Sequence, residues 1–131
     1  MTINGKWSLI IRGEFINVEE IERNMNLKAS RSYEKGQIIS ETVGENLQDV
    51  WIYEVNFNES LSLENALLEV VSQTEASYIK EIKQVCEVVL QCHVVSELAQ
   101  IRFGLSNYAL MKLQESGIDL RFSIFSWGVV E

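Results

Sequence analysis

Three residues with side chains suited to metal binding or catalysis lie close together in the second half of the chain: Cys86, Cys92 and His93. A zinc site normally needs four ligands, and the chain has no paired Cys-x-x-Cys motif that would supply them. The segment around these residues is expected to be a strand, in which Cys92 and His93 point to opposite faces. We therefore expect two buried, reduced thiols and no metal site.

General acid–base catalysis and phosphate binding also lack a recognisable motif. His93 is the only histidine, and neither Glu87 nor Glu97 is obviously placed to orient it as a general base. No GxGxxG, phosphate-binding loop or GxSxG motif occurs. The sequence thus predicts a protein that is not an enzyme, has no catalytic residues and uses no cofactor.

Positive charges gather in one segment of this acidic chain, residues 28–36. The segment has the least regular pattern of the chain, and irregular connections on a rigid scaffold often carry binding groups. We expect a binding site here that also includes an exposed tryptophan, Trp51 or Trp127. The expected site residues are Lys28, Arg31, Tyr33, Lys35, Trp51 and Trp127. The alternative is that the cations only form ion pairs with acids of the same region: Glu34, Glu41 and Glu45.

The elements that would position these residues follow from the spacing of apolar side chains. Alternating apolar residues predict strands with one buried face at residues 7–13, 50–57, 85–95, 99–105 and 118–124. Helical spacing and capping residues predict helices at 17–25, 62–73, 77–84 and 106–117. The strands 85–95 and 99–105 are expected to form an antiparallel hairpin, and Ile38 with Ile39 a short edge strand.

These elements predict one α+β domain that spans residues 1–131. Each strand has one apolar side and each helix one apolar stripe, so two layers suffice to bury them. We expect a two-layer structure: a mostly antiparallel five- or six-stranded sheet with the helices packed on one face. The content of 47% hydrophobic and 23% charged residues is that of a soluble globular protein.

The net charge of −8 limits the partners that this chain can have. Nucleic acids require a basic face, and anionic membranes repel an acidic protein. The chain has no apolar run near the roughly 20 residues of a membrane span. It begins without the features of a signal peptide, which predicts a cytoplasmic location. The charge instead favours attraction to a cationic protein.

Several short features occur in order along nearly the whole chain. They are a first strand that ends in glycine, the helix 18–25, Lys35–Gly36, Trp51 at the start of a strand, and Gly117–Ile118–Asp119–Leu120 near the end. Together they resemble the bacterial domain-of-unknown-function family numbered 4279. Where that family often has Pro-Thr before the Lys-Gly, this chain has Ala29–Ser30. The resemblance implies no activity and no catalytic residues.

Two functions are therefore expected from different classes. The first is a small acidic binding protein, in its most concrete form an immunity-type protein that neutralises a cationic bacterial toxin. Members of the resembled family are similar in size and acidity to such proteins, and complementary charge speeds encounter. The alternative is a sensor or regulatory domain that holds a small anionic ligand near Arg31, Tyr33 and Lys35.

Overall fold

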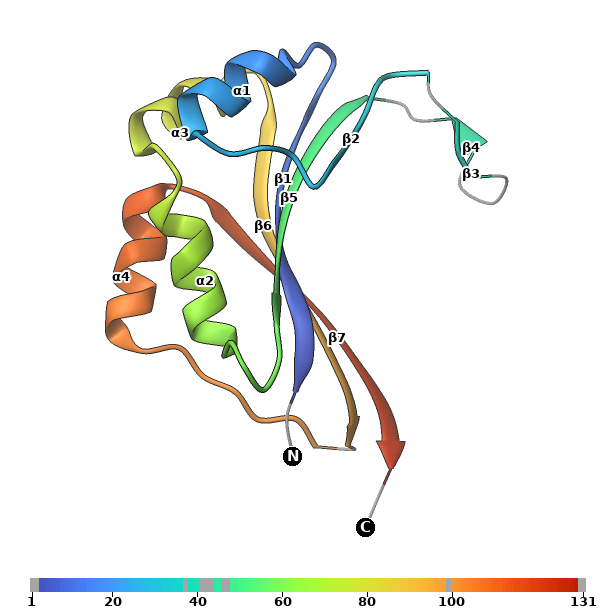
Figure 1. Cartoon of the computed structure of the whole chain (residues 1–131), viewed down its shortest axis with the longest axis vertical. Coiled ribbons are helices and arrows are strands. Elements are labelled where there is room, and N and C mark those ends of the chain that lie inside the picture. The colour runs from blue at the N-terminus through green and yellow to red at the C-terminus, as the bar shows by residue number, and fades with distance from the viewer. Residues whose placement is uncertain (1–2, 37, 41–43, 46–47, 99, 130–131) are drawn as a thin grey trace.

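The computed structural model describes residues 3–36, 38–40, 44–45, 48–98 and 100–129, and for 38–40, 44–45, 98 and 127–129 it describes the backbone alone. Within these ranges the chain forms strands and four helices (Figure 1). In chain order they are β1 (Asn4–Gly13), α1 (Val18–Met25), β2 (Arg31–Tyr33), β3 (Ile38–Ser40), β4 (Gly44–Glu45), β5 (Asp49–Phe57), α2 (Leu63–Ser72), α3 (Ala76–Ile82), β6 (Glu87–Leu98), α4 (Asn107–Ser116) and β7 (Asp119–Val129).

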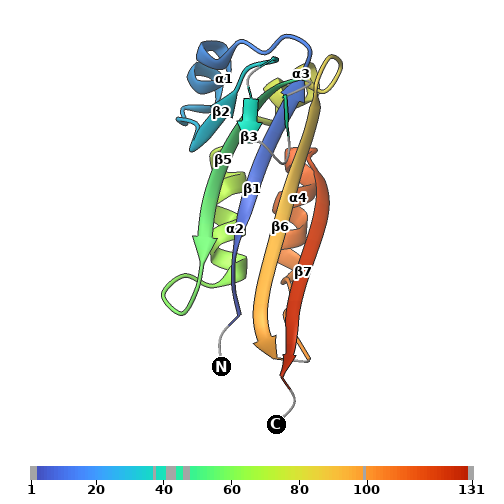
Figure 2. The same ribbon diagram turned by 90° about the vertical axis from the view of Figure 1, so that its right-hand side faces the viewer.

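The main sheet has five strands in the order β2-β5-β1-β6-β7. Neighbouring strands in this sheet are antiparallel, except β6 and β7, which run parallel. All four helices lie on one face of this sheet, whereas the short β3–β4 pair lies on the other side (Figures 1 and 2). This arrangement confirms the expected α+β fold with a mostly antiparallel sheet and helices on one face.

The predicted hairpin between residues 85–95 and 99–105 is wrong. Residues 100–106 form no strand, and the chain instead continues through α4 into β7, which adds parallel to β6. Parallel neighbours require such a crossover connection. The alternation in this segment has another cause, because Ile101 and Leu105 pack against the core while Phe103 contacts the ring of Phe122.

The core lies between the sheet and the helices. Trp7, Leu9 and Ile11 of β1 are fully buried, as are the side chains of Leu90, Cys92 and Val94 on β6. Each of the four helices contributes fully buried side chains to the core. Chief among them are Ile21, Leu67, Val70, Ile79 and Ala109. The strand periodicity thus correctly predicts which face of β1 and β6 is buried.

Local side-chain caps fix the ends of three helices. The side-chain oxygens of Asn17, Ser62 and Ser106 each accept a hydrogen bond at 3.1 Å from the backbone N–H three residues later. Gly117 ends α4 with a φ of 72°, a left-handed conformation in which glycine is favoured. No helix in the described part of the chain is both long and apolar enough to cross a membrane.

Candidate functional site

The predicted cationic segment is held by ion pairs and hydrogen bonds. Lys35 Nζ lies 2.7 Å from a carboxylate oxygen of Glu14, and Arg31 Nε lies 2.9 Å from one of Glu54. The hydrogen bond and charge of Glu14 raise the pKa of Lys35. Two of the three expected binding cations therefore already have carboxylate partners.

Asp49 joins two loops beside this segment. One of its oxygens accepts from the backbone N–H of Lys35 at 2.7 Å, and the other accepts from that of Ile16 at 3.1 Å. These two hydrogen bonds lower the pKa of the Asp49 carboxyl, because they favour its charged form. Asp49, which the sequence analysis did not select, thus orders the backbone around Lys35.

The other expected site residues have different surroundings. Lys28 is exposed, while Tyr33 is half-buried and lines a cavity of about 280 Å³ together with Lys35 and Asp49. The expectation that Trp51 is exposed is wrong: its side chain is fully buried on the helix side of β5. Trp127 belongs to β7, but its side chain lies outside the described part of the structure.

Trp51 is buried because β5 lies second in the sheet, between β2 and β1, and its odd-numbered residues face the helices. Its indole N–H has no hydrogen-bond partner in the described part of the chain. The structure thus brings Tyr33 and Lys35 together at one cavity and assigns Trp51 to the core.

Exposed apolar side chains lie on and beside the edge strand β7, from which the sequence analysis chose only Trp127 as a binding residue. Phe122 and Ile124 are 44% and 54% exposed on the helix-side face of β7, and Phe103 of the crossover, 37% exposed, contacts Phe122; we call these three residues the edge surface. Phe125 is 55% exposed on the opposite face of the strand. Phe122 packs edge-to-face on Trp7, with 6.2 Å between the ring centroids. The ring centroids of Phe122 and Phe103 are 5.8 Å apart. No strand pairs with the outer side of β7 in the described residues (Figure 2).

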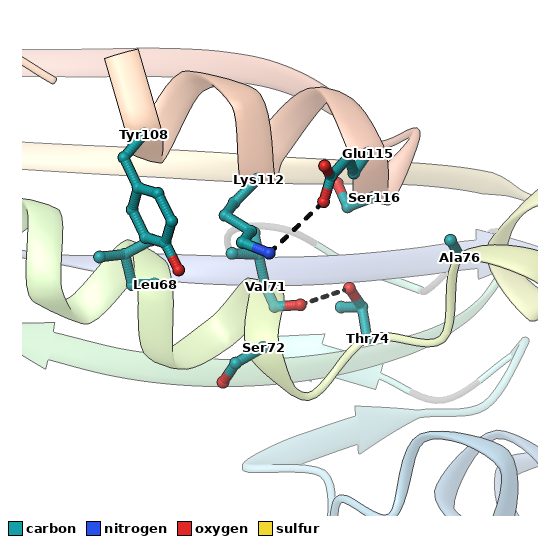
Figure 3. A pocket seen from close by; sticks show the side chains of 9 residues that line it. All are labelled: Leu68, Val71, Ser72, Thr74, Ala76, Tyr108, Lys112, Glu115 and Ser116. Atoms are coloured by element: carbon teal, nitrogen blue, oxygen red, sulfur yellow. Dashed lines mark hydrogen bonds and ion pairs between the residues drawn. The ribbon is translucent and has the colours of Figure 1, made fainter. Parts of the chain in front are cut away.

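A second feature that the sequence analysis missed is a cavity of about 440 Å³ between α2 and α4 (Figure 3). Its lining is Leu68, Val71, Ser72, Thr74, Ala76, Tyr108, Lys112, Glu115 and Ser116. The Lys112 ammonium points into it, 3.6 Å from a carboxylate oxygen of Glu115 and 5.6 Å from the centre of the Tyr108 ring. These residues come from segments more than thirty positions apart, so no local motif marks the cavity.

The cysteines and the histidine do not form a common site. Cys92 is fully buried on the helix side of β6, and burial raises the pKa of its thiol to about 12. Burial also raises the pKa of Cys86, and both thiols are free of disulfides. His93 is half-buried on the opposite face of β6, where Lys6 is its neighbour on β1. No group of three metal-ligand side chains occurs among the residues that the structure describes.

Comparison with known protein families identifies the chain at the family level. The family model of the domain of unknown function DUF4279 matches residues 2–127, which is nearly the whole chain. The chain belongs to the DUF4279 family. No curated protein and no solved structure gives a significant match. The resemblance seen in the sequence is thus confirmed, and DUF4279 membership leaves the function to be argued from the residues.

Proposed function

We propose that this DUF4279 protein is a small acidic binding protein of the immunity type, which acts in the cytoplasm and neutralises a cationic bacterial toxin. The observation that carries the proposal is the edge surface. Isolated exposed apolar residues are common, but here three large ones lie on one face of the sheet, Phe122 and Ile124 on the outermost strand and Phe103 in contact with Phe122. Contiguous apolar patches of this kind mark interaction sites more often than chance exposure does.

The geometry of β7 suits a protein partner better than a small molecule. The strand is eleven residues long and forms one edge of the sheet, so its outer backbone groups can pair with a strand of another chain. Exposed aromatic side chains beside it supply the few anchors that dominate the affinity of most protein interfaces. Phe122 is well suited to this role, because its packing on Trp7 holds the ring in place before a partner binds.

The overall charge favours one kind of partner. At −8, the chain attracts a cationic protein over several ångströms and repels other acidic proteins. Charge complementarity mainly raises the association rate, whereas the aromatic anchors lower the dissociation rate. The combination fits an inhibitor that must find and hold a basic toxin.

Replacing Ile124 with lysine tests this proposal. In cells that express a cationic toxin from a gene found beside this one, the wild-type chain should restore growth and Ile124→Lys should not. The change removes an anchor of the edge surface and adds a charge that repels a cationic partner. We expect the affinity to fall about tenfold or more, since interface anchors contribute about 2 kcal/mol or more each.

Val85→Lys is the matched control. Val85 is 77% exposed in the connection between α3 and β6, outside the edge surface, so the same change of side chain should leave rescue intact. Equal loss of rescue in both variants would show that added charge matters and that the edge surface does not. If Ile124→Lys still rescues growth at full level, the edge surface is not the binding site.

The alternative function, a sensor of a small anionic ligand, has one observation in its favour: Tyr33 and Lys35 line the cavity of about 280 Å³. It has less support, because Asp49 and Glu34 line the same cavity and Lys35 is already paired with Glu14. A thermal-shift screen with nucleotides and anionic metabolites tests this function. A ligand at one hundred times its Kd adds about 2.7 kcal/mol of stability, which Arg31→Glu with Lys35→Glu should abolish. The absence of any shift would argue against a sensor.

A further inference from the structure

The cavity between α2 and α4 runs along two helices that point in the same direction and reaches their C-terminal ends at Thr74 and Ser116 (Figures 1 and 3). Each helix carries a partial negative charge at this end. Neither α2 nor α4 has a basic residue in its own last turn, and at the end of α4 the Lys83 ammonium donates to the carbonyl of Gly117 at 2.8 Å. Glu115 adds a full negative charge to the lining, which the Lys112 ammonium offsets; once that ammonium leaves, the cavity offers a favourable potential to another cation.

The hydroxyl groups of the lining are oriented as acceptors. Ser72 Oγ donates its proton to the carbonyl of Glu69 at 2.9 Å, and Thr74 Oγ1 donates to that of Val71 at 2.8 Å. A hydroxyl has a single proton to donate, so each of these oxygens has only lone pairs left for a ligand. With the Glu115 carboxylate they form a set of acceptors, and such a set binds a donor-rich group.

The contacts of Lys112 show that this lining can hold a cationic group. Its ammonium group lies over the face of Tyr108 and beside the carboxylate of Glu115. The Lys112 side chain is 40% exposed and has a flexible four-carbon stem, so it can leave the cavity at little cost in free energy. Leu68 and Val71 form the apolar part of the lining, against which the aliphatic stem of a long basic side chain can pack.

We propose that this cavity binds an arginine side chain of the partner protein, which takes the place of the Lys112 ammonium. The inference rests on the proposed function, because it names a group of the cationic partner. A guanidinium stacks on an aromatic ring more favourably than an ammonium does. Its five N–H donors also match several acceptors at once, here the oxygens of Ser72, Thr74 and Glu115. Arginine therefore fits the cavity better than lysine.

A peptide titration of the intact protein tests the inference without the partner. The probe is acetyl-Gly-Gly-Arg-Gly-Gly-amide, and the comparison peptide carries citrulline, which has a similar shape but no charge. In NMR spectra of the labelled protein, the arginine peptide should shift the ring signals of Tyr108 and the backbone amides of Ser72 and Thr74. The citrulline peptide should cause no comparable shifts.

Three variants give the expected changes in Kd. Glu115→Gln removes the carboxylate and should weaken binding about fivefold, whereas Lys112→Gln removes the competing cation and should strengthen it by a similar factor. Glu19→Gln changes the net charge as Glu115→Gln does, but at an exposed position in the first turn of α1, and should leave the Kd unchanged. Each replaced side chain is at the surface, so thermal unfolding should be nearly the same in all variants.

The inference is wrong if the citrulline peptide binds as well as the arginine peptide, or if Glu19→Gln weakens binding as much as Glu115→Gln. It is also wrong if the shifted signals lie outside the cavity. Its failure is separable from that of the proposed function, because the titration does not involve the edge surface. A chain in which Ile124→Lys abolishes rescue but the arginine peptide does not bind would retain the proposed function and lose only this site.

Discussion

Replacing Trp7 with alanine should lower the free energy of unfolding by about 3–5 kcal/mol, the range measured for large aromatic residues in cores. Trp7 is fully buried in the central strand β1, and its indole N–H donates to the carbonyl of Leu63 at 2.8 Å. It also supports the ring of Phe122, so its loss would loosen the edge surface. Urea unfolding followed by circular dichroism measures the effect as a lower midpoint.

A pair of conservative changes separates packing from hydrogen bonding at this position. Trp7→Phe and Trp51→Phe remove the same atoms from two fully buried side chains. Trp7 loses a hydrogen bond, whereas the Trp51 indole N–H has no partner in the described part of the chain. Trp7→Phe should therefore cost about 0.5–1.5 kcal/mol more than Trp51→Phe. Equal costs in the two variants would show that the bond to Leu63 does not contribute to stability.

Local signals predicted most of the elements and their buried faces. Asn17 and Ser106 do cap helices, and Gly117 does end α4, because each of these interactions involves residues within a few positions of one another. The alternation of apolar residues in β1 and β6 likewise specifies which side chains face the helices, since the period of a strand is local geometry.

Contacts between distant segments explain where the sequence analysis was wrong or incomplete. Residues 100–106 alternate like a strand, but they belong to the crossover from β6 to β7, where Ile101 and Leu105 pack against the core and no strand pairing forms. Phe122 and Ile124 lie on the apolar side of β7 as the pattern predicts, and yet they are exposed. Their exposure depends on the tertiary arrangement, in which β7 is an edge strand with a neighbouring strand on one side alone.

The same limit applies to the candidate sites. Lys35 forms an ion pair with Glu14, which lies 21 residues away in the chain. The composition of the cationic segment alone therefore did not reveal the partner of Lys35. The cavity between α2 and α4 depends on two helices that run in the same direction on one face of the sheet, a relation that no single stretch of sequence contains. The residues that we assign to it are ordinary surface residues when each helix is considered alone.

Replacing Gly5 with alanine should destabilise the protein by about 2–4 kcal/mol, as severe overpacking does. A Cβ at this position would overlap the carbonyl oxygen of His93 on β6 and lie 2.6 Å from the Phe57 ring. The obstacle is backbone on one side and a fully buried ring on the other, so neither can move aside cheaply. Glycine within a strand commonly marks such a close approach.

Gly104→Ala provides the comparison for this change. A Cβ at Gly104 would meet no atom within 4 Å, so the same substitution should change the free energy of unfolding by less than about 0.5 kcal/mol. Hydrogen exchange should locate the damage in Gly5→Ala at the paired ends of β1 and β6, where Gly5 lies opposite Val94. Because β7 pairs with β6 at this same level, opposite Val94 at Ile124, the edge surface should lose order in Gly5→Ala as well. If Gly5→Ala is as stable as Gly104→Ala, β1 and β6 do not approach as closely as described.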